Sequence, residues 1–296
     1  MKRSSPRLPL ATVILFALLT GAIAGQDAPG KKEVIPVTPV VEDNPVHPIT
    51  GPYWNEDSFI GTDVRPVFAY HNFPGEIFGG GRATVSALQL RVQITKQLQF
   101  VAYKDGWMDI KTKGYKNDGW NDIAAGLKFA FLQDSARQLY SAVGLGYEFA
   151  SGDDNVLQDD DEIRFWWSIN KGFGKLHLGA TVNYFLACDN GHDQFGDSNH
   201  LSWHIHADYE VCKYFSPVFE VNGYHVLDEG DVVTPFSGDD VLNLGGNKNE
   251  NTITAALGAE VRPCSRFAVR AAYERAINDD HDLFGHRWTF SAVIKF

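Results

Sequence analysis

The chain has 296 residues, of which 44% are hydrophobic and 21% are charged, and its formal net charge is -11. This acidic balance argues against nucleic acid as a partner, because a phosphate backbone attracts basic proteins. Aromatic residues make up 13% of the chain, which is enough to bury a core and argues against general disorder. Only one apolar run approaches membrane-spanning length, at the extreme N-terminus, so a bundle of membrane helices is excluded.

The N-terminal residues 1–24 have the pattern of a secretory signal peptide. Lys2, Arg3 and Arg7 form a positively charged start, and residues 8–19 form an apolar run. Residues 22–24 read Ala-Ile-Ala, a small-residue cleavage pattern. We therefore predict a signal peptide that is removed by cleavage, with an uncleaved N-terminal helix as the alternative.

The next stretch, residues 25–57, holds six of the 13 prolines of the chain. Proline fixes its own backbone and lacks an amide hydrogen, so this stretch favours extended conformations and cannot pack as a helix or an inner strand. We predict a mobile, Pro-rich periplasmic linker here, with a cell-wall tether as the alternative.

From residue 58 to residue 296, short segments alternate apolar and polar residues. In the last segment, Trp288, Phe290 and Ile294 share one face, while Arg287 and Thr289 share the other. A period of two residues is typical of strands with two different faces. Twelve such segments can be counted, at residues 59–70, 83–94, 97–104, 121–132, 138–150, 162–170, 174–186, 198–211, 214–226, 251–262, 266–276 and 284–296.

The connections between these segments are alternately tight turns and longer loops. No helical period separates the segments, which disfavours folds that alternate strands with helices. The pattern predicts an all-β fold, a transmembrane antiparallel up-and-down β-barrel of about 12 strands over residues 58–296. A soluble sandwich is the alternative, but its outward face would be polar. Pro66 and Pro217 fall inside predicted strands and indicate bulges or strand ends there.

The C-terminal strand carries the most specific signal in the chain. It ends on an aromatic residue, Phe296, and presents Trp288, Phe290 and Ile294 on the same face. With the signal peptide and the repeated alternation, this strand resembles those of Gram-negative outer-membrane β-barrel proteins of the porin-like kind. The resemblance implies location in the outer membrane after cleavage, contact with outer-membrane lipid, and recognition of these four residues by the barrel-assembly machinery.

The polar face of the predicted barrel should line its lumen. Its basic residues concentrate on the last two and first two strands, and its acidic residues on the eighth to tenth, so opposed charged sectors are expected. Opposed sectors in an open pore would select polar solutes, whereas interior salt bridges would instead fill and stabilise the barrel. The predicted lumen-lining residues are Asp63, Arg65, Arg91, Lys128, Glu148, Arg164, His204, His206, Asp208, Glu210, Glu220, Glu260, Arg270 and Arg287.

Twelve strands make a barrel between the packed eight-stranded barrels and the wide porins. We therefore predict a passive, porin-like channel for small polar solutes, with a non-conducting structural or surface-interaction barrel as the alternative. An outer-membrane enzyme is a weaker alternative. His204 and His206 lie on one face with Asp208 and could form a metal pair, but lumen lining is the preferred interpretation. No catalytic Ser/His constellation is recognisable, and we expect neither enzymatic activity nor a cofactor.

The long loops carry many carboxylates, which could bind divalent cations that bridge the lipopolysaccharide surface or could simply be solvated. They are Asp153, Asp154, Asp159, Asp160, Asp161, Glu162, Asp189, Asp193, Asp197, Asp228, Glu229, Asp231, Asp239, Asp240, Asp279, Asp280 and Asp282. Cys212 and Cys264 fall in tight turns on the same side of the barrel, where either a disulfide or two free thiols is possible.

Overall fold

The structure is a computed structural model that describes residues 45–76, 79–156, 161–188, 198–229, 238–242, 248, 251–278 and 283–296. The predicted signal peptide, residues 1–24, and residues 25–44 of the predicted linker lie outside the described residues. Within the described part of the chain, no helix is both long enough and apolar enough to cross a membrane.

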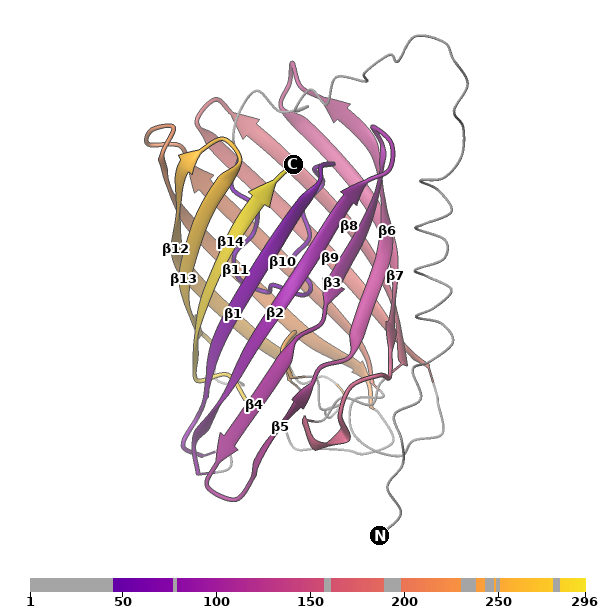
Figure 1. Cartoon of the computed structure of the whole chain (residues 1–296), viewed down its shortest axis with the longest axis vertical. Coiled ribbons are helices and arrows are strands. Elements are labelled where there is room, and N and C mark those ends of the chain that lie inside the picture. The colour runs from indigo at the N-terminus through magenta and orange to yellow at the C-terminus, as the bar shows by residue number, and fades with distance from the viewer. Residues whose placement is uncertain are drawn as a thin grey trace. The chain divides into compact units, whose positions relative to one another are not determined.

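Strands dominate the structure and form one antiparallel sheet that closes on itself, because β1 pairs with both β2 and β14 (Figure 1). Two pairs of strands each run end to end, and each pair counts as one stave, meaning one strand position around the barrel wall. The fourteen strands therefore form twelve staves, and the predicted all-β, twelve-stranded barrel is confirmed. The strands are β1 (Asp63–Phe73), β2 (Gly81–Gln93), β3 (Leu98–Lys104), β4 (Trp107–Thr112), β5 (Lys116–Trp120), β6 (Ile123–Asp134), β7 (Leu139–Phe149), β8 (Asp161–Phe173), β9 (Leu176–Cys188), β10 (Asn199–Tyr209), β11 (Phe215–Asp228), β12 (Asn251–Cys264), β13 (Phe267–Ala276) and β14 (His286–Lys295).

The third and fourth staves are longer than the sequence predicts. β2 pairs with β3 near its C-terminal end and with β4 near its N-terminal end, so β3 and β4 run along β2 as one interrupted stave. β5 pairs with β4, and the β4–β5 hairpin lies at the long-loop end of the barrel (Figure 1). Residues 105–120 therefore form a strand pair rather than the loop that the predicted strands 97–104 and 121–132 leave between them.

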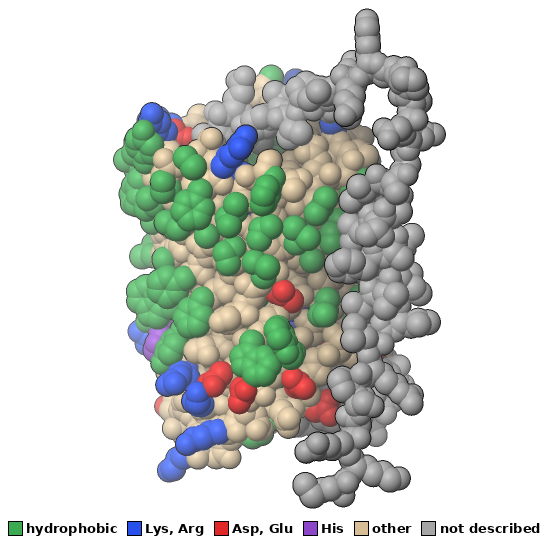
Figure 2. Space-filling model, in the orientation of Figure 1, with side chains coloured by type: hydrophobic (Ala, Val, Ile, Leu, Met, Phe, Trp, Pro, Cys, Tyr) green, Lys and Arg blue, Asp and Glu red, His purple; other side chains and the backbone are tan. Residues whose placement is uncertain are grey.

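The outer surface of the barrel is apolar. Successive strand residues alternate between buried and exposed positions, and in the view of Figure 2 the exposed large apolar side chains cover the middle of the face, with most charged side chains toward its two ends. This band suits lipid, since lipid offers no hydrogen bonds and tolerates no exposed sheet edge. Exposed residues on the terminal strand and beside it include Phe68, Trp288, Phe290, Ile294 and Phe296.

The two in-strand prolines sit where the ladder does not need their missing amide. Pro66 pairs with Leu88 of β2, and the β1–β14 ladder has no pairing at this position. Pro217 precedes Val218, the residue at which the β10–β11 ladder begins.

The interior has two different halves. An apolar cluster occupies the half near the long loops and includes Phe73, Met108, Phe185, Tyr224 and Leu283. The half near the short turns is polar and is lined by charged side chains that are almost completely buried, such as Arg91 and Lys128.

Candidate functional site

The interior wall holds the charged residues that the alternation predicts. All fourteen predicted lumen residues except Glu210 are buried, while their neighbours along each strand face outward. Glu210 lies just beyond the end of β10, in the β10–β11 turn, and is only half-buried, because the strand ends one residue before it.

A segment of the chain itself fills the space between these walls. Residues 45–58, here called the plug, are inside the barrel, and Figure 1 shows them as an indigo coil within it. Thr50 and Ser58 are completely buried, and Trp54 is 5% exposed. The sequence predicts a mobile linker over residues 25–57. The structure differs for residues 45–57 because its prolines suit an extended loop, and the wall supplies the hydrogen bonds that this loop cannot make internally.

The two acidic residues of β10 and β11 hold the beginning of the plug. Asp208 accepts a hydrogen bond from the Val46 amide at 3.2 Å, and Glu220 accepts from the amides of Ile49 and Thr50 at 2.9 and 2.7 Å. His206 lies between these carboxylates, with ring nitrogens 2.7 Å from Glu220 and 3.2 Å from Asp208. Each ring nitrogen faces a carboxylate oxygen, and a protonated ring donates to both of them.

An acidic pair near the end of the plug meets the basic wall. The Glu56 carboxylate lies 2.6 Å from Arg91 Nη2 and 2.8 Å from Lys128 Nζ. Asp57 is 2.6 Å from His47 Nδ1, so this contact ties the two arms of the plug together. Burial by itself raises the pKa of Glu56, but Arg91 and Lys128 outweigh burial and lower the pKa to about 2. Glu56 is therefore ionised at neutral pH.

Arg164 of β8 holds the middle of the plug through its backbone. Its guanidinium donates to the carbonyl oxygens of Tyr53 at 2.9 Å and of Trp54 at 2.6 Å. The same guanidinium stacks on the rings of Tyr103 and Trp166, 4.6 and 4.7 Å from their centroids. A planar cation with several donors suits this position, because it bonds two carbonyls while its faces contact aromatic rings.

The indole of Trp54 anchors the plug on the apolar cluster. Its ring centroid lies 4.4 Å from that of Phe185, 4.8 Å from that of His200 and 5.7 Å from that of Tyr224. Tyr53, beside it, donates its hydroxyl to the Asp105 carbonyl oxygen at 2.8 Å. The plug therefore reaches from the charged half of the lumen into the apolar half.

Residues 239–242 of the β11–β12 loop also lie in the interior. Asp240 accepts from Arg287 of β14 at 2.7 Å, and Arg287 is paired on its other side with Glu274 at 2.9 Å. Val241 and Leu242 are buried in the apolar cluster. These four loop residues and the plug lie together in the long-loop half of the lumen.

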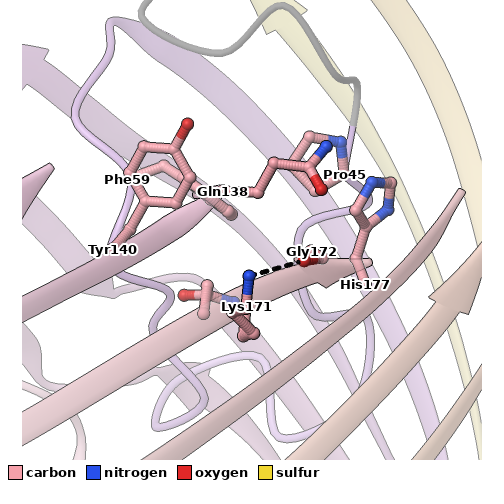
Figure 3. A pocket seen from close by; sticks show the side chains of 8 residues that line it. Pro45, Phe59, Gln138, Tyr140, Lys171, Gly172 and His177 are labelled. Carbon is pink, nitrogen blue, oxygen red and sulfur yellow. Dashed lines mark hydrogen bonds between the residues drawn. The ribbon is translucent and has the colours of Figure 1, made fainter. Parts of the chain in front are cut away.

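A shallow pocket marks the short-turn end, beside the plug (Figure 3). Pro45 at the start of the plug and Phe59 just after it both line this pocket. Lys171 and Gly172 of β8 form its floor, where Lys171 Nζ donates to the Gly172 carbonyl oxygen at 2.9 Å. Gln138, Tyr140 and His177, labelled in Figure 3, also line the pocket, as does Asn170.

His204 and His206 have wall partners rather than a shared ligand position. His204 lies 2.8 Å from Asn222 and 3.0 Å from Ser202 through its two ring nitrogens, and His206 is held between carboxylates. Across the described residues, no group of three or more His, Cys, Asp or Glu side chains has the arrangement to hold a metal ion.

The loop carboxylates that the structure describes have several partners. Asp153 accepts from the Trp120 amide at 2.8 Å, Asp228 pairs with Lys248 at 2.8 Å, and Asp239 and Asp240 point inward. Residues 159, 160, 189, 193, 197, 231, 279, 280 and 282 lie outside the described residues. Cys212 and Cys264 are exposed free thiols, so the two do not form the disulfide that the sequence leaves open.

No protein-family model matches this chain, and no curated protein does. Among solved structures, the chain is similar to a KdgM porin, with a TM-score of 0.48 and 8% identity over 79% of this chain and 99% of that chain. It is also similar to the translocator domain of the autotransporter NalP from Neisseria meningitidis, with a TM-score of 0.46 and 11% identity over 97% and 98% of the two chains. For the outer-membrane protein OprD from Pseudomonas aeruginosa, the TM-score is 0.37 and the identity 11%, over 81% and 94%.

Proposed function

We propose that this chain is an outer-membrane channel for small polar solutes that is closed, in the state described, by its own residues 45–58. One observation carries the proposal: in the short-turn half, the lumen wall is charged and contacts the plug through ion pairs and hydrogen bonds, as between Glu56 and Arg91. A polar wall can exchange such contacts for water or for a polar solute when the plug leaves.

The outer surface supports the membrane location. A closed sheet with an exposed apolar belt is stable in lipid and would expose a large apolar surface in water. The outward Trp288, Phe290, Ile294 and Phe296 are suited to recognition by the barrel-assembly machinery of the outer membrane, and the loop carboxylates to cation bridges with lipopolysaccharide.

A permanently closed structural barrel is the second candidate. The apolar cluster around Trp54, Phe185 and Leu242 favours it, because the cluster packs apolar side chains of the plug, the wall and the β11–β12 loop together in the long-loop half. In this candidate, loss of the plug contacts destabilises the barrel and opens no pore.

Planar-bilayer conductance separates the two candidates. We compare the wild-type chain with Glu56→Gln/Asp57→Asn, which removes both carboxylates of the plug, and with Asp109→Asn, which breaks an exposed pair on β4. The channel proposal predicts long closed periods for the wild type and for Asp109→Asn, and frequent current steps for the double variant. If none of the three proteins conducts, although heat-modifiable gel mobility shows that all are folded, the channel proposal is rejected.

A further inference from the structure

We propose that the plug occupies an anion-binding site in the lumen, so that the Glu56–Asp57 pair stands in for a solute carrying carboxylates or similar anionic groups. This inference rests on the proposed channel function and names the class of solute. It follows from which buried charges depend on the plug and which do not.

The acidic residues of the wall do not need the plug for a cationic partner. The plug contains no Lys or Arg, and its one His, His47, is paired with the plug residue Asp57. The wall carboxylates have wall partners instead, in the pairs Asp63–Arg65, Glu148–Lys104, Asp208–His206, Glu220–His206, Glu260–Arg262 and Glu274–Arg287. Removal of the plug leaves these pairs intact.

Several basic residues of the wall do depend on the plug. Among the described residues, Arg91 has only Glu56 as an acidic partner, and Lys128 has only Glu56 and Asp57. Arg270 donates to the carbonyl oxygens of His47 and Pro48, at 3.0 and 3.1 Å. Arg164 donates to plug carbonyls as well, and neither Arg164 nor Arg270 forms an ion pair with a described carboxylate.

This asymmetry determines the sign of the electrostatic potential in the lumen after the plug has left. When the plug leaves, two carboxylates leave with it. Arg91, Lys128, Arg164 and Arg270 then lose plug partners, and Arg65 loses its contact with Asp57 at 3.7 Å, while no wall anion loses a cation. Charges in a confined space with low-dielectric walls are poorly screened, so the space attracts anions. The sequence predicts opposed charged sectors, and the contacts make them unequal, because His206 lies between Asp208 and Glu220 of the acidic sector.

The position of Glu56 indicates the chemistry of the ligand. One carboxylate bridges a guanidinium and an ammonium, and the backbone carbonyl of the same residue accepts from the hydroxyls of Ser168 at 2.6 Å and Thr181 at 2.7 Å. A small solute with anionic groups and hydroxyl or carbonyl oxygens can satisfy the same donors. A cation or an uncharged apolar molecule cannot.

Competition between solute and plug tests the inference without requiring current. In a full-length chain with Cys188, Cys212 and Cys264 replaced by serine, Ser58→Cys places a probe thiol at a completely buried plug position. Labelling by a neutral maleimide then reports release of the plug. Citrate is the anionic probe, compared with sorbitol and spermidine at equal concentration and with all samples held at one ionic strength by sodium chloride.

The expected result is faster labelling with citrate and no change with sorbitol or spermidine, because a ligand that binds only the unplugged state increases its population. The acceleration should disappear in Arg91→Gln/Lys128→Gln. It should persist in Lys175→Gln/Lys213→Gln, which removes the same charge from exposed turn positions. Equal labelling rates with all three probes would overturn the inference, as would an equal citrate effect in both double variants.

Reversal potentials in a potassium chloride gradient distinguish a wrong solute class from a wrong function. Glu56→Gln/Asp57→Asn should conduct with a preference for chloride, and addition of Arg91→Gln/Lys128→Gln should reduce this preference several-fold. Current without anion preference and without a citrate effect would reject the anion site while the channel stands. A citrate effect without any current would reject the channel while the anion site stands.

Discussion

The Glu56 carboxylate contacts two buried cations at once, and its removal is the sharpest test at the scale of a single residue. Glu56→Gln keeps the size of the side chain, leaves Arg91 without a charged partner and leaves Lys128 with only Asp57, 3.5 Å away. Breaking a buried pair in this way costs about 3–5 kcal/mol. We expect a lower midpoint of heat-induced unfolding on gels and faster labelling of a probe thiol at position 58.

The control for this variant is Asp109→Asn. Asp109 pairs with Lys111 at 2.6 Å on an exposed strand, where Lys111 is 47% exposed. Exposed pairs contribute less than about 1 kcal/mol, so its midpoint should stay close to that of the wild type. Equal midpoints for Glu56→Gln and Asp109→Asn would contradict the role assigned to Glu56.

Burial of single charged residues follows from alternation in the sequence, but the identity of their partners does not. Parity along each strand predicts that Arg91, Lys128 and Glu220 face inward, and they do. Their partners in the plug are far away in sequence, with Thr50 and Glu220 separated by 170 residues. No local pattern in the sequence predicts such a contact. The only local signal was the acidic Glu56 and Asp57 at the end of a proline-rich stretch.

At the scale of elements, the junction of β3 and β4 depends on Gly106. This residue has φ of +113°, and a Cβ there would lie 2.5 Å from the Ser86 carbonyl oxygen and 2.9 Å from Ala87. Gly106→Ala should therefore destabilise the barrel by about 1–3 kcal/mol. Gly114→Ala is the matched control, because nothing lies within 4 Å of its Cβ position. Indistinguishable unfolding midpoints of the two variants would show that the junction is not strained.

The last strand provides a second prediction for an element. Phe296 is 72% exposed on the outer surface, so its side chain contributes little to packing within the barrel. If the assembly machinery reads it, Phe296→Ser should lower the amount of barrel in the outer membrane of cells, while refolding of the purified protein into detergent is unchanged. Phe173→Ser, at another exposed aromatic position, should change neither quantity. Equal losses for the two variants in cells would contradict recognition of Phe296.

The sequence predicts most strands of the barrel because lipid-facing positions must be apolar. It misses β4 and β5 for the same physical reason. Outer positions such as Asp109, Lys111 and Asp118 are polar on this hairpin, so the apolar outer face that identifies the other strands is reduced here to Trp107 and Trp120. Pairing with β2 and β4 supplies the hydrogen bonds that local composition does not indicate.

At the scale of the whole molecule, the plug and the barrel form one hydrogen-bonded unit. The plug is attached to β8, β10 and β11 by Arg164, Asp208 and Glu220, which lie on the opposite side of the sheet order from β1. Arg91 of β2, Lys128 of β6 and Arg270 of β13 contact the plug from other parts of the wall, so the wall holds the plug from several directions. Release of the plug must break these contacts together, which predicts a cooperative closed-to-open transition rather than a graded one.

A reducible bridge between plug and wall tests the closure of the lumen most directly. Ser58 Oγ donates to Asn170 Oδ1 at 2.7 Å, so thiols introduced by Ser58→Cys and Asn170→Cys can be joined by a short bis-methanethiosulfonate in a chain that lacks the native cysteines. With Glu56→Gln/Asp57→Asn also present, planar-bilayer current should be absent while the bridge is intact and should appear when a reductant cleaves it. The same current before and after reduction, with bridging verified by mass, would contradict the account that residues 45–58 close a channel.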